Sequence, residues 1–89
     1  MKKSDFVRVM RDIGEYSDAQ EAEKALNTFL LSVTEILKNG ENISFVEFGS
    51  FEMVKKRTRK KGENYLKATP IFRVSEVLKQ KISYIVEDN

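Results

Sequence analysis

The ten residues from Lys55 to Asn64 contain no apolar side chain, although the sequence on both sides of them is typical of β-strands. Ile43–Phe51 is rich in aromatic and β-branched residues, and Tyr65–Phe72 has the composition of a returning strand. A strand pair without an apolar face has nothing to bury on a hydrophobic core. We therefore expect residues 53–69 to form a β-hairpin arm that projects into solvent, with turn residues within Lys60–Asn64.

The same arm carries the positive charge of the chain. Residues 1–52 contain 6 Lys and Arg against 10 Asp and Glu, so they are acidic, whereas the whole chain has a net charge of +2. Residues 53–69 hold seven cations and a single acid, Glu63. A patch of this kind is the electrostatic footprint expected for a phosphate backbone. A solvated run of charge is the alternative if the segment is considered alone.

Two amphipathic helices are expected before residue 40. The first begins at Ser4 as N-cap and ends at Gly14, with apolar residues at helical spacing at Phe6, Met10 and Ile13. The second follows a capping-box pattern at residues 17–20 and ends near Gly40. Its apolar stripe exceeds what one short helix covers, and it consists of Leu26, Phe29, Leu30, Val33 and Leu37. The surplus favours burial against a second subunit, although an ordinary core helix has the same stripe.

The second half of the chain predicts a sheet followed by a helix. Ile43–Phe51 predicts a hairpin that enters a long strand, and Ser75 is the expected N-cap of a last helix with Leu78, Ile82 and Ile85 on one face. The fold class is therefore α+β in one domain, residues 1–89: a helical dimerisation part at 1–40, the sheet and arm at 41–74, and a C-terminal helix at 75–89. We assign the phenylalanines of the sheet to packing rather than to base stacking, namely Phe45, Phe48, Phe51 and Phe72.

The composition argues against an enzyme, a metal-binding protein and a membrane protein. The chain of 89 residues has neither Cys nor His, so it lacks thiol chemistry, the commonest general base and the commonest metal ligand. We expect no catalytic residues, metal, cofactor or small-molecule substrate. No apolar run approaches the roughly 20 residues of a membrane helix, and the start has no signal-peptide core, so we expect a cytoplasmic protein without a membrane partner.

Several motifs in one order resemble the bacterial histone-like HU and integration host factor family. They cover most of the chain, and they are Lys3–Val7, Val33–Glu41, Ile43–Phe45, Phe48–Glu52, Pro70–Arg73 and Leu78–Lys79. The resemblance implies an intertwined dimer of the chain with itself or with a related subunit, a saddle of β-sheet, and two β-arms that embrace double-stranded DNA. The implied function is nucleoid-associated, architectural DNA binding with little sequence preference.

The candidate DNA-binding residues lie mainly on the arm: Lys3, Lys55, Lys56, Arg57, Arg59, Lys60, Lys61, Asn64, Tyr65, Lys67, Arg73 and Lys79. Arg57 and Arg59 are the strongest candidates, because guanidinium groups suit phosphate oxygens and narrow minor grooves. Strand alternation would place Lys55, Arg57, Arg59 and Lys61 on one face of the arm, with Lys56 and Lys60 on the other. A register slip by one residue would exchange the two sets. Lys3, Arg73 and Lys79 match body positions of the family, and ordinary surface cations are the alternative for each.

The chain also departs from the family pattern. The arm tip of the family reads Gly-Arg-Asn-Pro, and its proline wedges into a base step, whereas this chain has Gly62-Glu63-Asn64-Tyr65. The return strand is shorter than in the family, and Glu76 stands where the family often has lysine. These departures predict weaker binding or less bending. They also motivate an alternative function, a dimerising module of the same fold that binds a protein partner with weak or no DNA binding.

Overall fold

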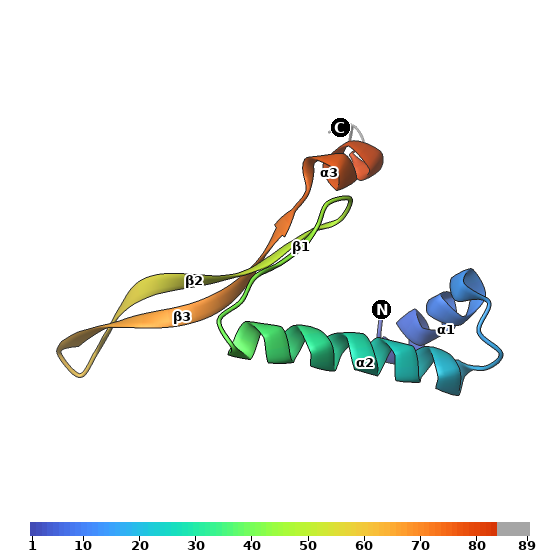
Figure 1. Cartoon of the computed structure of the whole chain (residues 1–89), viewed down its shortest axis with the longest axis horizontal. Coiled ribbons are helices and arrows are strands. Elements are labelled where there is room, and N and C mark those ends of the chain that lie inside the picture. The colour runs from blue at the N-terminus through green and yellow to red at the C-terminus, as the bar shows by residue number, and fades with distance from the viewer. Residues whose placement is uncertain (84–89) are drawn as a thin grey trace, which may run out of the picture. The chain divides into compact units, whose positions relative to one another are not determined.

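The computed structural model describes residues 1–83 and has the expected α+β order of elements (Figure 1). The chain divides into two compact units, residues 1–35 and the part that begins at Ile36, and each is described by itself. The elements are α1 Lys3–Gly14, α2 Ala19–Lys38, β1 Ile43–Phe45, β2 Gly49–Lys60, β3 Glu63–Val74 and α3 Glu76–Ile82.

Helix α1 begins two residues earlier than the sequence predicted. Its N-cap is Lys2, because the Asp5 carboxylate accepts a hydrogen bond from the Lys2 backbone N–H at 3.0 Å. Ser4 is therefore inside the helix, and its assignment as N-cap is wrong. The helix ends at Gly14, where an added Cβ would lie 2.6 Å from the Tyr16 ring. The left-handed C-cap is Glu15 rather than the glycine, with φ 54°.

Helix α2 begins at the predicted capping segment. The Asp18 carboxylate accepts a hydrogen bond from the backbone N–H of Glu21 at 2.9 Å, and the Glu21 carboxylate accepts one from the Ser17 N–H at 3.1 Å. These bonds satisfy donors that the first turn of a helix leaves unpaired. The other end closes at Gly40, whose φ of 78° suits a left-handed helix terminus, so the predicted stop is confirmed.

The sheet is antiparallel with the order β1-β2-β3, and it forms the predicted hairpin arm. β2 and β3 continue as a two-stranded ribbon beyond the short β1 (Figure 1). The ribbon closes through two turn residues, Lys61 and Gly62, which have φ of 55° and 80°. Positive φ at both positions is the geometry of a tight hairpin turn that matches strand twist. The turn therefore lies within Lys60–Asn64 as predicted, and Glu63 and Asn64 already belong to β3.

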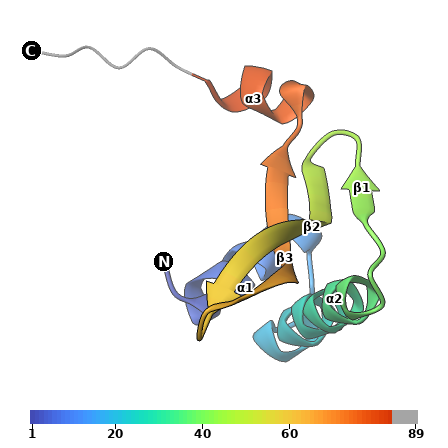
Figure 2. The same ribbon diagram turned by 90° about the vertical axis from the view of Figure 1, so that its left-hand side faces the viewer.

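The three strands of the sheet lie side by side where β1 pairs with β2 (Figure 2). This part of the sheet holds a cluster of phenylalanines. The Phe72 ring centroid lies 4.9 Å from that of Phe51 and 5.5 Å from that of Phe48. A Cβ added to Gly49 would lie 2.4 Å from the Arg73 carbonyl oxygen, which explains a glycine beside this cluster. These contacts support the assignment of the phenylalanines to packing.

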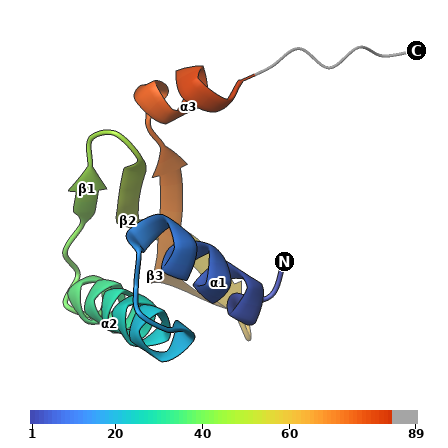
Figure 3. The same ribbon diagram turned by 90° about the vertical axis from the view of Figure 1, so that its right-hand side faces the viewer.

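Helix α3 follows the end of β3 (Figure 3). Ser75 is its N-cap as predicted, because its hydroxyl oxygen accepts a hydrogen bond from the Leu78 N–H at 3.0 Å. The helix ends at Ile82 with an extended C-cap at Ser83, whereas the sequence predicted a helix that continues to residue 89. The positions predicted to continue it, residues 84–89, lie outside the described residues.

Little of the described chain is buried. Within residues 1–83, the buried apolar side chains are Val7 of α1 and Ala22 of α2. Large apolar side chains on the same helices are exposed, including Phe6, Ile13, Phe29, Leu30 and Leu31. No helix in this part of the chain is long and apolar enough to cross a membrane.

Candidate nucleic-acid interface

The arm presents two faces with different side chains. Pairing between β2 and β3 is unbroken from Gly49↔Val74 to Lys60↔Glu63, so alternate residues of each strand lie on opposite faces. We call one surface the Arg57 face, formed by Lys55, Arg57 and Arg59 opposite Ala68, Leu66 and Asn64. The other is the Lys56 face, formed by Lys56, Thr58 and Lys60 opposite Lys67, Tyr65 and Glu63.

The register assigns most arm cations to the predicted faces and corrects one of them. Lys55, Arg57 and Arg59 share a face, and Lys56 and Lys60 share the other, as alternation predicted. Lys61 belongs to neither face, because it is the first residue of the turn and has positive φ. Lys67 and Thr58 join the Lys56 face. Sequence reasoning missed Thr58, whose position opposite Tyr65 follows only from the register.

All seven arm cations are exposed. Within residues 1–83, none of their side chains has an ion-pair or hydrogen-bond partner. Acids are also sparse, because Glu63 is the only one on the arm and it stands opposite Lys60. The cations of the arm are therefore available to an external anion.

Arg73 and Lys79 of the second unit, by contrast, have acidic partners. Arg73 Nε donates to Glu52 Oε2 at 2.6 Å, and Lys79 Nζ lies 3.4 Å from Glu76 Oε1. Both cationic side chains remain more than half exposed, so a phosphate would compete with a neighbouring carboxylate for each. Ion pairs at such exposure are weak.

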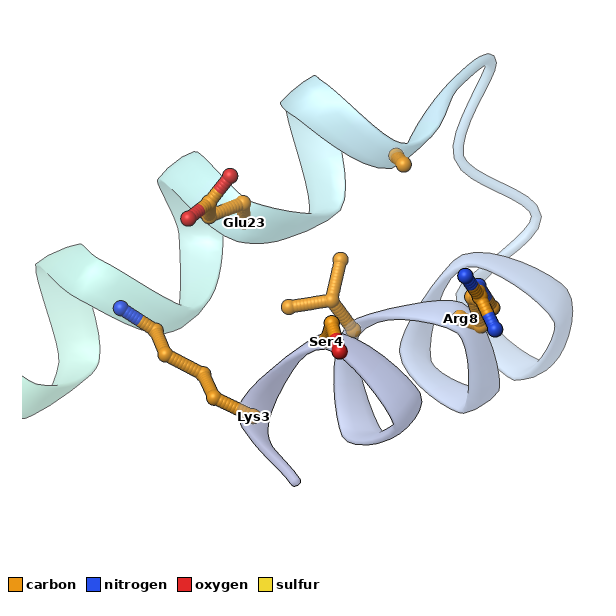
Figure 4. A pocket seen from close by; sticks show the side chains of 6 residues that line it. Lys3, Ser4, Arg8 and Glu23 are labelled. Carbon is orange, nitrogen blue, oxygen red and sulfur yellow. The ribbon is translucent and has the colours of Figure 1, made fainter. Parts of the chain in front are cut away.

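In the first unit, Lys3 reaches from α1 toward α2 (Figure 4). Its Nζ donates to the side-chain oxygen of Asn27 at 2.6 Å. The neighbouring hollow of about 410 Å³ is lined by Lys3, Ser4, Val7, Arg8, Ala19 and Glu23. Because Glu23 stands among the cations, the lining has mixed charge and does not form an anion site by itself. Lys3 keeps a neutral partner, which competes less with a phosphate than a carboxylate does.

The two residues that follow Asn64 lie on opposite faces of the arm. Tyr65 is on the Lys56 face and 42% exposed, whereas Leu66 is on the Arg57 face and 64% exposed. A hollow of about 130 Å³ lies here, lined by Arg57, Asn64, Tyr65 and Leu66. Both apolar surfaces are therefore open to a ligand, but from different sides of the ribbon.

This arrangement suits a polyanion rather than a small substrate. A two-stranded ribbon can enter a groove of duplex DNA while cations on its faces contact the phosphates at the rims. Within the described residues, no group of three or more acidic side chains is placed to hold a metal ion.

Comparison with known proteins identifies the family. The family model described as bacterial DNA-binding protein matches residues 1–83, which is almost the whole chain. The chain belongs to this family. Relatives named DNA-binding protein HU include one from Helicobacter pylori J99, which is 32% identical over 92% of this chain and 96% of its own length. The HU of Thermotoga maritima is 33% identical over 91% of this chain and 97% of its own length. The resemblance noted in the sequence is thus confirmed.

Solved HU structures have the same fold as this chain. A mutant HU from Thermotoga maritima aligns with a TM-score of 0.69 at 32% identity, covering 93% of this chain and all of the other. An HU from Anabaena, solved in a cocrystal with DNA, aligns with a TM-score of 0.75 at 21% identity and covers 93% of this chain and 98% of the other. At that identity the second similarity concerns the fold alone. The α+β class and the HU-like order of elements are confirmed.

Proposed function

We propose that this protein is an architectural DNA-binding protein that binds duplex DNA with little sequence preference as a dimer. The observation that carries the proposal is the arm, on which seven exposed cations lack a partner within residues 1–83. The family and the names of the relatives support the same function.

The dimer is part of this proposal because a single chain leaves too much apolar surface in water. Phe6, Leu30 and Phe48 are each more than 40% exposed, and the described residues bury only Val7 and Ala22 as apolar side chains. A chain of 89 residues with so small a core needs a partner subunit for stability. Two chains would also bring two arms to one duplex and double the available charge.

In this function the arm cations contact phosphates and the minor groove, and they fix the position of the protein without reading sequence. We assign this role to Lys55, Lys56, Arg57, Arg59, Lys60, Lys61 and Lys67, with Asn64 and Tyr65 beside them. Lys3, Arg73 and Lys79 are proposed as secondary contacts, because each has an intramolecular hydrogen bond that DNA must replace.

The acidic partners of Arg73 and Lys79 favour a second candidate function. They reduce the positive charge of the second unit outside the arm, as expected for a dimerising module that binds a protein partner and binds DNA weakly or not at all. The arm argues against this function, because its cations would have no role there.

Duplex binding separates the two functions. The wild type is compared with a variant carrying Arg57→Gln, Arg59→Gln, Lys60→Gln and Lys61→Gln, in fluorescence anisotropy with a duplex of mixed sequence. We expect the variant to remain a dimer in sedimentation and to bind at least thirtyfold more weakly, because charge-assisted contacts contribute about 1.5–3 kcal/mol each and the loss of two of them already exceeds this factor. Equal, weak binding by both proteins would instead support the protein-partner module.

A further inference from the structure

Lys56 and Lys67 are directly opposite each other in the register of β2 and β3. Directly opposed residues of an antiparallel pair have Cβ atoms about 5 Å apart, so like charges at such positions destabilise the pairing. Both lysines are exposed, and neither side chain has a partner within the described residues. The arm therefore places two lysines of like charge directly opposite each other, without an acidic partner for either within the described residues.

No other β2–β3 pair of the ribbon places two like charges opposite each other. The remaining cations of β2 face neutral or acidic residues, in the pairs Lys55↔Ala68, Arg57↔Leu66, Arg59↔Asn64 and Lys60↔Glu63. Across the β2–β3 pairs, all of which lie in the described part of the chain, Lys56↔Lys67 is the single like-charged pair. A solvated run of cations has no reason to place two of them directly opposite each other.

Hydroxyl groups flank the lysine pair on the same face. The next pair outward is Thr58↔Tyr65, and the next pair inward contains Thr69 opposite Val54. Tyr65 is 42% exposed, and the register places it on the same face as both lysines. These are hydrogen-bond donors without negative charge, and they suit an anion that the two lysines attract.

We propose that Lys56 and Lys67 together hold one phosphate of the DNA backbone, with the Tyr65 hydroxyl donating to the same or the adjacent phosphate. This proposal rests on the proposed function. A phosphate between the two ammonium groups replaces their repulsion with two attractive contacts, so the pair has more to gain from an anion than any isolated arm lysine. Tyr65 then acts as a hydrogen-bond donor to the backbone.

The test uses Lys56→Gln, Lys67→Gln and the double variant, with Lys55→Gln as a matched control. Lys55 is the neighbouring residue of the same type, but it faces Ala68 on the other face, so its removal takes away the same charge without relieving a repulsion. Two quantities are measured on the full chain: duplex affinity as a function of salt, and amide hydrogen exchange of the arm without DNA. Lys56→Arg, which keeps the charge, serves as the conservative variant.

We expect Lys56→Gln or Lys67→Gln to slow amide exchange in the arm about two- to fivefold, because the repulsion is gone. Either variant should also weaken DNA binding about tenfold and reduce the salt slope by about 2 per dimer, one phosphate on each arm. The double variant should lose little more than either single variant, because both lysines hold the same phosphate. Lys55→Gln should leave exchange unchanged, and Lys56→Arg should keep the salt slope.

Additive losses in the double variant would overturn the shared phosphate, and so would an equal slowing of amide exchange in Lys55→Gln. These outcomes leave the proposed function intact, because the wild type still binds duplex DNA. Failure of the wild type to bind any duplex would instead overturn the proposed function and this inference together.

Discussion

The guanidinium of Arg73 on β3 donates to the carboxylate of Glu52 on β2 at 2.6 Å, across two strands and 21 positions of sequence. The two residues are diagonal neighbours on one face of the sheet. Arg73 pairs with Ser50, and Glu52 lies two residues after Ser50 on the same strand. Glu52 is therefore an internal competitor for any phosphate that approaches Arg73.

Removing this competitor should strengthen DNA binding. We expect Glu52→Gln to raise duplex affinity about threefold or more at low salt and to steepen the salt slope by up to about 2 per dimer, because both Arg73 side chains become available. Stability should change little, since a pair this exposed contributes about 0–1 kcal/mol. Anisotropy titration measures the affinity. Glu47→Gln is the control, because it removes one acid of the same unit without releasing Arg73, and an equal gain there would point to net charge alone.

The exposed apolar residues of α2 predict a concentration-dependent stability. We expect two chains in sedimentation at micromolar concentration, and a destabilisation of about 2–5 kcal/mol per chain for Leu30→Ala, which is 45% exposed in the single chain. Urea unfolding at several protein concentrations measures both effects. If Leu30 faced water in the assembled protein, the substitution would stay within about 0.5 kcal/mol and the midpoint would not depend on concentration.

DNA binding should be dominated by counterion release. With about six to eight phosphates contacted per dimer, the logarithm of the binding constant should fall against the logarithm of salt concentration with a slope of roughly −5 to −7. Titrations of one duplex between low and physiological salt give this slope. A flat response, or a strong preference for one sequence among several duplexes, would contradict a phosphate-based mechanism.

The sequence was sufficient to predict the arm and the order of elements, for reasons that lie in particular residues. Lys55–Asn64 has no apolar side chain to bury, and Gly40 and Ser75 are placed where helix ends need them. The N-cap of α1 was assigned wrongly because no capping preference singles out Lys2 in the sequence. Ser4 has the preferred hydroxyl, but Asp5 bonds back to Lys2 and starts the helix earlier.

What the sequence could not supply was register. A turn with Lys61 at positive φ is an uncommon use of a non-glycine residue, so the sequence placed the turn within Lys60–Asn64 without identifying its two residues. Register decides that Lys67 faces Lys56, and that Arg73 comes within reach of Glu52. The functional character of the arm was thus predictable from composition, but the partners of its individual cations required the register of the β2–β3 hairpin.

The last prediction concerns bending of the DNA. The family resemblance aligns Tyr65 with the proline wedge, but Tyr65 is the third residue of β3 rather than part of the turn, and it pairs with Thr58. Leu66, the other apolar candidate, lies on the opposite face, so the two side chains cannot enter the same base step together. Unstacking a base step costs a few kcal/mol, and one tyrosine with a polar tip beside Lys56 and Lys67 is poorly suited to offset that cost.

We therefore expect modest bending without a sharp kink, measured by fluorescence transfer between the ends of a labelled duplex of about 35 base pairs. Tyr65→Phe removes only the hydroxyl, and it should weaken binding while leaving the end-to-end distance unchanged, because in this mechanism the ring does not intercalate. Leu66→Ala is the matched change on the other face and should alter neither quantity strongly. Strong compaction by the wild type that persists in Tyr65→Phe and disappears in Tyr65→Ala would show that the tyrosine ring has replaced the proline as a wedge. The same loss in Leu66→Ala alone would assign the wedge to leucine.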